Sequence, residues 1–332
     1  MADMLKTIVN PLSYLANLRF LIRASGQRTI FPLYHAVSDE ELAHLSYIQN
    51  VRNVETFESD LETLLKFFTP VSLRDYLSGK PSRKNRVVLT FDDGLRECHD
   101  IIAPILARKG IPAVFFLNAS FLDNKDLFYR YKASLLIEHY CKKDCTSDEM
   151  DELLGVEKRY VKQSLLKIGY DQRAMLDQIA SSSGFSFEEY LVNHPVYLTG
   201  VQVQSLIKDG FEIGSHSFDH PRFSKLPPKT IRDQVLNSID ALNRRFGLKT
   251  KYFAFPFTSD GVPLDVINNL LVLDKVDALM GTSGLKTYTH PGFIQRIPME
   301  ERAWPAYRIL KIEYLYYYLK APFGRNRYRG GQ

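Results

Sequence analysis

The chain has 332 residues, which is long enough for two average domains or one large α/β barrel. Hydrophobic residues make up 45% and charged residues 24%, so a disordered or collagen-like chain is excluded. The 43 basic and 38 acidic side chains leave a net charge of +5, too small to indicate nucleic-acid binding by itself. An odd count of three cysteines in so long a chain indicates reduced thiols rather than a disulfide-stapled fold.

The first thirty residues do not have the pattern of a signal peptide. Lys6, Asn10 and Pro11 interrupt the apolar residues, and no small-residue cleavage site follows. The chain also has no run of about 20 apolar residues that could span a bilayer. We therefore expect a cytoplasmic protein without a transmembrane segment.

Strand-like and helix-like segments alternate from residue 86 onward. Residues 86–91 (RVVLTF) form a β-branched run that predicts a buried strand, and residues 111–120 predict a second one. Between them, residues 95–109 have apolar side chains at helical spacing, and Gly110 closes the helix. Such a βαβ unit favours a parallel sheet covered by helices.

The same alternation resumes after residue 197. A helix is predicted within residues 226–246, with two prolines at its start and Gly247 at its end. The strands predicted in this part of the chain are residues 210–217, 251–257, 276–283 and 292–299. The stretch between the two blocks, residues 121–196, is charged and has few strand formers, so we expect an insertion of several helices.

Two histidines four residues apart, His216 and His220, stand in the segment HSFDHP. On one turn of helix or in a tight loop, both rings can face one point, as a zinc-like ion requires. Two surface or capping histidines would give the same spacing. This pair alone therefore leaves both interpretations open.

Two adjacent carboxylates, Asp92 and Asp93, end the predicted strand in TFDDG. Neighbouring strand side chains point to opposite faces, so both can serve one site only where the strand has just ended and Gly94 allows a turn. An aspartate that caps the following helix is the alternative. One carboxylate and two histidines would make a three-ligand set with an open position, and the second carboxylate would then be free to act as a general base.

TFDDG followed by HSFDHP resembles the polysaccharide deacetylase family, the NodB-homology domain of carbohydrate esterase family 4. An upstream LYHAVS, which contains His35, resembles a segment often found before TFDDG in that family. The resemblance covers roughly residues 30–120 and 197–300. It implies an α/β fold, a distorted (β/α)7 barrel with a helical insertion, whose site lies at the C-terminal ends of the strands.

By this resemblance, Asp92 is the general base and a metal-bound water is the nucleophile. Asp93, His216 and His220 are the metal ligands, and we expect zinc there, with Co²⁺ or Ni²⁺ as alternatives. Asp219 is expected to orient one of the ligand histidines.

Two positions depart from the family pattern. Ala254 stands where the third motif of the family carries an arginine that orients the base. Phe255 and Pro256 keep the hydrophobic frame of that motif and are candidates for substrate contact. The Leu-x-His that normally supplies the general acid has no clean match, so His290 and His35 are the candidates for that role.

The resemblance implies a hydrolase that acts on carbon–nitrogen bonds in linear amides. We expect it to remove N-acetyl groups from acetamido sugars of an envelope glycan or its precursor. Two alternatives stay open: an O-acetyl esterase that acts on xylan-type glycan, and a metal-holding but inactive glycan-binding protein. The expected partner is an acetylated saccharide, and the sequence leaves the oligomeric state undetermined.

We expect residues 31–120 and 197–300 to form the barrel, after an N-terminal extension at 1–30 and before a C-terminal helix and basic tail at 301–332. The insertion at 121–196 is expected to shape the substrate site rather than the metal site. Within it, Arg130 and Lys132 are candidates to bind an anionic sugar group. The aromatic and basic tail could pack over the barrel or contact a membrane peripherally.

Overall fold

The computed structural model describes residues 16–142 and 160–330. Its main element is a parallel sheet of eight strand segments in the order β10-β9-β8-β7-β6-β5-β2-β11. These segments are β2 (Pro32–Tyr34), β5 (Leu89–Phe91), β6 (Ala113–Leu117), β7 (Glu212–Ser215), β8 (Tyr252–Ala254), β9 (Ala278–Gly281), β10 (Phe293–Gln295) and β11 (Ile297–Pro298).

The two ends of this sheet belong to one stretch of chain. β10 pairs with β9, and β11 pairs with β2, and only Arg296 separates β10 from β11. The last strand therefore joins the first and last members of the sheet and closes it into a barrel of seven strands. This closure confirms the fold class that the sequence predicts.

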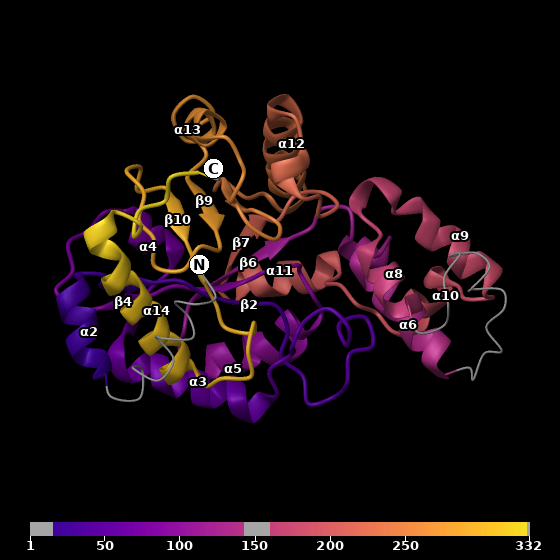
Figure 1. Ribbon diagram of the computed structural model, residues 1–332, viewed down its shortest axis with the longest axis horizontal. Helices are drawn as coiled ribbons and strands as arrows, with labels where there is room; N and C mark the ends of the chain where they lie inside the picture. The colour runs from indigo at the N-terminus through magenta and orange to yellow at the C-terminus, as the bar shows by residue number, and fades with distance from the viewer. Residues whose placement is uncertain (1–15, 143–159, 331–332) are drawn as a thin grey trace.

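Helices cover the outside of the barrel, as Figure 1 shows. They are α2 (Leu18–Ser25), α3 (Val54–Phe67), α4 (Leu73–Leu77), α5 (Ala103–Arg108), α11 (Gly200–Lys208), α12 (Pro228–Phe246), α13 (Leu264–Val272) and α14 (Ala306–Lys320). A small parallel sheet of β1 (Thr29–Ile30), β4 (Arg86–Val87) and β3 (Thr69–Pro70) flanks the barrel.

The predicted elements agree with the observed ones, with local differences. The strand expected over 86–91 is interrupted at Val88, and the two halves pair in different sheets. The helix expected over 95–109 starts with a π-helical turn at Cys98–Ile102 and continues as α5. Gly247 ends α12 with a φ of 67°, the left-handed conformation that the sequence suggested.

Residues between β6 and β7 form a helical lobe at one side of the barrel (Figure 1). The lobe contains α6 (Tyr129–Lys142), α8 (Val161–Lys167), α9 (Ala174–Ser182) and α10 (Phe187–Asn193). Leu136, Leu165 and Leu176 are buried in an apolar cluster of its own, which also takes in Ala36 and Leu45 from the barrel loops. The lobe therefore packs against the loops of the barrel that contain Ala36 and Leu45.

The C-terminal helix α14 packs against α2 and α3. Tyr314 is fully buried in this contact, and its hydroxyl donates to the Gln27 carbonyl at 2.7 Å. This packing accounts for part of the tyrosine-rich tail, while peripheral membrane contact stays a prediction. Within residues 16–142 and 160–330, no helix combines the length and apolarity needed to cross a membrane.

Candidate metal and catalytic site

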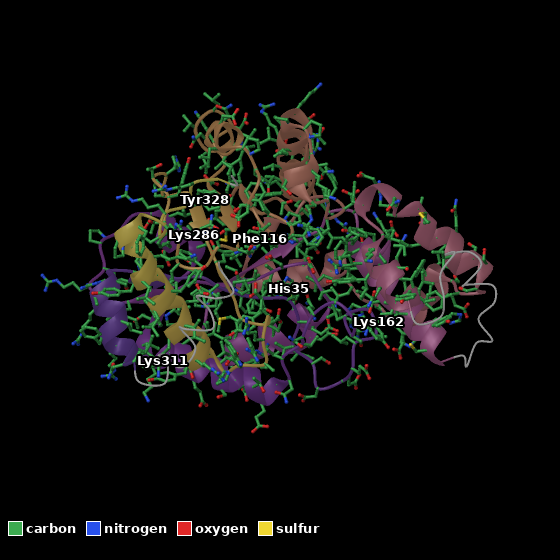
Figure 2. The ribbon with its side chains drawn as sticks, in the orientation of Figure 1. His35, Phe116, Lys162, Lys286, Lys311 and Tyr328 are labelled. Atoms are coloured by element: carbon green, nitrogen blue, oxygen red, sulfur yellow. The ribbon has the colours of Figure 1, made fainter. Side chains whose placement is uncertain are left out.

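The residues singled out in the two motifs meet at the carboxyl ends of the barrel strands. Asp92 and Asp93 follow β5, His216 follows β7, and His220 lies in the loop after it. Together with His35, which follows β2, they line a cavity of about 240 Å³. His35 lies near the middle of the molecule in Figure 2.

A sharp backbone turn lets the two adjacent aspartates face the same cavity. Asp93 and Gly94 both adopt left-handed conformations, with φ of 70° and 66°. A Cβ on Gly94 would lie 2.9 Å from the Leu117 side chain and would also be strained at this left-handed φ, so glycine is strongly favoured at this position. The turn thereby supplies the chain reversal that was expected of Gly94.

Three ligand atoms form a nearly equilateral triangle. The Nε2 atoms of His216 and His220 are 3.1 Å apart, and Asp93 Oδ1 lies 3.4 and 3.3 Å from them respectively. Ligands at zinc-like bond lengths in a tetrahedral site are separated by ~3.3 Å. These distances match one face of such a tetrahedron.

The chemistry of these three atoms also fits a divalent cation. His216 Nδ1 lies 2.8 Å from the Ala254 carbonyl, so this nitrogen carries the proton and Nε2 keeps its lone pair. Burial lowers the pKa of His216 to about 4, which keeps the ring neutral, as a metal ligand must be. Asp93 Oδ1 is buried and accepts no hydrogen bond from any residue that the structure describes. A cation would satisfy all three atoms.

The helical lobe contributes directly to this group. Tyr131, on α6, is fully buried, and its hydroxyl donates to Asp93 Oδ2 at 2.5 Å. This bond leaves Oδ1 as the carboxylate oxygen that faces the histidines. The lobe was expected to shape the substrate site rather than the metal site, but one of its residues holds a candidate metal ligand; its role at the substrate site stays a prediction.

We expect Tyr131→Phe to weaken metal binding ~10–100-fold, as loss of a hydrogen bond to a metal ligand typically does. Competition with a chelator measures the affinity, and the absorption spectrum of the Co²⁺ form reports the coordination geometry. Tyr197→Phe is the matched control, because the Tyr197 hydroxyl accepts a hydrogen bond from the Phe128 amide, whereas Asp93 accepts its hydrogen bond from Tyr131. Unchanged metal affinity in Tyr131→Phe would show that this hydrogen bond does not position the ligand.

Asp92 is paired with an arginine that sequence analysis missed. Arg296 Nη1 and Nη2 lie 2.6 and 2.7 Å from the two Asp92 oxygens, and both side chains are buried. Arg296 is the residue between β10 and β11, where the barrel closes. It supplies a guanidinium to the aspartate although Ala254 stands where the family arginine was expected.

This ion pair sets the protonation state of Asp92. Burial by itself would raise the pKa of Asp92, but the Arg296 guanidinium outweighs burial and lowers that pKa below its ordinary value. Asp92 is therefore ionised at neutral pH. Its Oδ2 lies 3.8 Å from His216 Nε2, so a carboxylate able to accept a proton stands beside the triangle.

His35 forms a second pair with Glu300, which sequence analysis also missed. His35 Nδ1 lies 2.6 Å from Glu300 Oε2, and the same carboxylate accepts from the His35 and Ala36 amides. Burial lowers the pKa of His35, but the hydrogen bond and charge of Glu300 outweigh it and raise the pKa to about 9. An imidazolium with Nε2 left for another partner therefore lines the cavity.

Two other predicted site residues are placed differently. His290 lies three residues before β10, at the amino end of a parallel strand, whereas the site lies at the carboxyl ends. Asp219 accepts hydrogen bonds from Tyr170 and from Gln234, at 3.3 Å for the latter, and so ties the motif loop to the lobe. The carbonyl of Ala254, not Asp219, is the group that orients His216.

The predicted substrate-contacting pair lies mostly in the core. Phe255 is 1% exposed and packs against Phe223 and Phe253, and Pro256 is also buried. Phe257 is half-buried at the cavity wall, and its ring lies 4.7 Å from that of His220. Phe255 also lines this cavity, but Phe257 is the more exposed of the two rings and is therefore better placed to contact a substrate.

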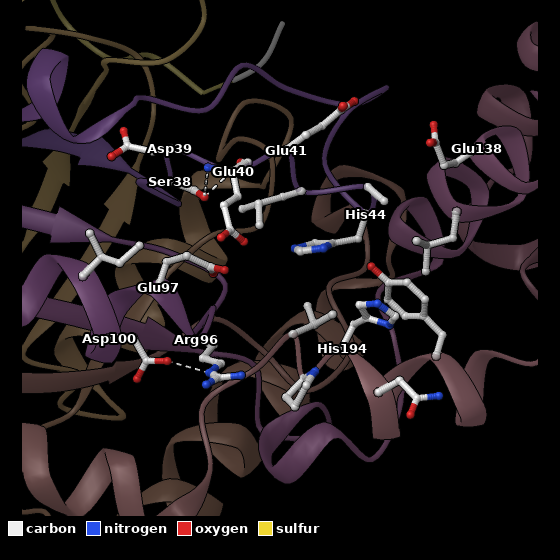
Figure 3. Close-up of a pocket in the computed structure, with 18 of the residues that line it drawn as sticks. Ser38, Asp39, Glu40, Glu41, His44, Arg96, Glu97, Asp100, Glu138 and His194 are labelled. Carbon is white, nitrogen blue, oxygen red and sulfur yellow. Dashed lines mark hydrogen bonds and ion pairs between the residues drawn. The ribbon is translucent and has the colours of Figure 1, made fainter. Parts of the chain in front are cut away.

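A larger hollow, of about 1020 Å³, lies between the loop at residues 38–44 and the lobe (Figure 3). Carboxylates such as Glu40, Glu97 and Asp100 surround it, and Arg96 is paired with Asp100 at 2.5 Å. The residues of the triangle do not line this hollow. Size alone therefore does not identify the reactive site, whereas the side-chain chemistry does.

The molecule is thus a closed parallel barrel with a His–His–Asp cluster, able to hold a metal ion, at the carboxyl ends of its strands, where barrel enzymes have their active sites. The profile of the polysaccharide deacetylase family matches residues 79–163 and 174–270, more than half of the chain. The chain therefore belongs to the polysaccharide deacetylase family, whose members are hydrolases of acetylated sugars.

One curated relative is the uncharacterized protein YlxY of Bacillus subtilis (strain 168), which is 40% identical over 53 residues. That match spans 16% of this chain and 17% of the relative, so most of the relative's length is not covered.

Solved structures share the fold at low sequence identity. Streptococcus pyogenes deacetylase PplD, in complex with acetate, matches with a TM-score of 0.55 and 13% identity, covering 86% of this chain and 97% of that one. IcaB from Ammonifex degensii matches with a TM-score of 0.54 and 17% identity, covering 86% of this chain and 98% of that one. A de-N-acetylase from Aggregatibacter actinomycetemcomitans matches with a TM-score of 0.53 and 16% identity, covering 85% of this chain and 99% of that one.

Proposed function

We propose that this protein is a metal-dependent hydrolase that removes N-acetyl groups from acetamido sugars of an envelope glycan or its precursor. The observation that carries the proposal is the triangle of Asp93, His216 and His220 beside an arginine-paired Asp92 in a deacetylase-family barrel. Zinc is the ion we propose, with Co²⁺ or Ni²⁺ able to replace it. Asp93, His216 and His220 would hold such an ion, and it would supply polarisation of the acetyl carbonyl and a lowered pKa of bound water.

Asp92 accepts the proton of the attacking water in the proposed reaction. Its ionised state suits it to this role, and Arg296 fixes the orientation of its carboxylate through two hydrogen bonds. The water oxygen bonds to the acetyl carbon, and the carbon–nitrogen bond then breaks. The products are acetate and a free amino sugar.

His35 donates the proton that the leaving nitrogen needs. Glu300 is hydrogen-bonded to Nδ1 of His35, so Nε2 is the nitrogen that donates the proton in the proposed reaction. The His35–Glu300 pair thus replaces the Leu-x-His histidine that the sequence lacks. His290 is not proposed for this role, because it lies at the other end of its strand.

We expect His35→Gln to lower kcat by ~100-fold or more, the loss typical of removing a general acid. In the wild-type protein, kcat should fall as the pH rises through about 9, because His35 then loses its proton. This alkaline limb should be absent in the variant. His44→Gln is the control: burial lowers the pKa of His44 to about 4, so that ring is neutral throughout the range. An unchanged alkaline limb in His35→Gln would exclude His35 as the donor.

A screen for acetate release tests the function itself. It covers acetylated saccharides, including nucleotide-linked and lipid-linked sugars, each with and without a chelator. We expect release that stops when the metal is removed. Release from O-acetylated xylan alone would support the esterase alternative. Absence of release from every saccharide, with glycan still bound, would support an inactive binding protein, although the Arg296–Asp92 pair argues against that reading.

A further inference from the structure

A hollow of about 530 Å³ adjoins the catalytic cavity on the side of the helical lobe. Arg130, at the start of α6, lines both the hollow and the cavity. The two spaces are also linked through Phe257, since the Arg222 guanidinium lies 4.7 Å from the centre of that ring and Phe257 packs on His220. A molecule in the catalytic cavity could therefore extend into the hollow.

The hollow is strongly cationic. Arg130, Lys167, Arg222 and Lys225 line it, and Asp171 is the one carboxylate among its described lining residues. None of these four cations is paired with a carboxylate in the part of the chain that the structure describes. The Arg130 Nε atom is buried and has no hydrogen-bond partner there.

Lys132, the other cation expected to bind an anionic sugar, does not share this property. Its Nζ lies 2.8 Å from both Asp126 and Asp177, so its charge is already neutralised within the lobe. The structure therefore separates the two candidates: Arg130 faces the cavities, and Lys132 holds the lobe together.

We propose that the cationic hollow binds a phosphoryl group attached to the acetamido sugar that is deacetylated, so that the substrate is a sugar phosphate or phosphodiester. This inference rests on the proposed function. The four cations around the hollow outnumber its one described carboxylate, Asp171, and this excess of positive charge favours a group with about two negative charges over a single carboxylate. A guanidinium group, such as that of Arg130 or Arg222, can donate two parallel hydrogen bonds to two oxygens of one phosphate.

The test compares kcat/KM for N-acetylglucosamine 1-phosphate, neutral N-acetylglucosamine oligosaccharides and an N-acetylated disaccharide that contains a uronic acid. The variants are Arg222→Gln and Lys225→Gln, the second of which leaves the contact with Phe257 intact. Lys249→Gln, which removes an exposed lysine outside the hollow, is the charge-matched control.

We expect the wild-type protein to prefer N-acetylglucosamine 1-phosphate over the other substrates. For this substrate, kcat/KM should fall roughly ten-fold in Arg222→Gln and in Lys225→Gln, because each variant loses a charge-assisted hydrogen bond. Lys225→Gln and Lys249→Gln should leave the neutral substrates unchanged. A preference for the neutral or the uronic-acid substrate would overturn the proposal. Equal losses on phosphorylated and neutral substrates would overturn it as well.

A binding measurement keeps this inference separate from the proposed function. Calorimetric titration with N-acetylglucosamine 1-phosphate should show binding that weakens in Arg222→Gln and in Lys225→Gln, even if no saccharide releases acetate. Lack of acetate release with intact, variant-sensitive binding would refute the deacetylase function and keep the phosphate site. If acetate is released but neither variant changes the binding, the deacetylase function is supported and the phosphate site is refuted.

Discussion

Asp92→Asn is expected to lower acetate release by ~10²–10⁴-fold, the range typical of losing a general base. An amide cannot accept the proton of water, while Asp93, His216 and His220 are untouched and should retain the metal. Metal content and acetate release must be measured on the same preparation. Loss of the metal in Asp92→Asn together with its retention in Asp93→Asn would exchange the two proposed roles.

The stability of Asp92→Asn needs its own control. The substitution leaves the Arg296 guanidinium without its counter-charge in the barrel interior, and breaking a buried ion pair costs about 3–5 kcal/mol. Asp60→Asn is a matched variant, because Asp60 is also buried and lies 3.4 Å from Arg52, outside the site. We expect it to lose stability and keep activity. Similar losses of activity in both variants would indicate damage to the fold instead of to the base.

His216→Ala is expected to remove most of the metal and nearly all activity. A site reduced to two protein ligands loses much of its affinity, and the wild-type protein should hold about one ion per chain. Asp93→Asn should lose metal and activity together, because a neutral amide oxygen is a poorer ligand than a carboxylate. Elemental analysis after dialysis measures the metal content of both variants, and acetate release measures their activity.

His290→Ala is the control for the histidine substitution, since His290 lies at the opposite end of the strands. It should keep the metal and the activity. Near-full occupancy by zinc, cobalt or nickel in His216→Ala would refute the ligand assignment. Loss of metal in His290→Ala would mean that a general loss of structure explains the results.

The sequence by itself predicted a parallel sheet covered by helices, a helical insertion and the grouping of Asp92, Asp93, His216 and His220, whereas the closed barrel was implied by the resemblance to the polysaccharide deacetylase family. These predictions succeeded because the signals are local. Each motif follows a strand directly, and the carboxyl ends of parallel strands meet at one edge of a barrel. The turn at Gly94 and the spacing of the two histidines needed only a few neighbouring residues to be recognised.

The partners of these residues were decided by the tertiary structure alone. Arg296 lies 204 residues from Asp92, Glu300 lies 265 residues from His35, and Tyr131 reaches Asp93 from the helical lobe. No local pattern marks these pairs, because an arginine, a glutamate or a tyrosine is common in any sequence. Closure of the barrel by its last strand brings Arg296 and Glu300 beside the first strands, and the fastening of the lobe brings Tyr131 to the site. Buried charges must find such partners, and the path of the chain determines which ones are within reach.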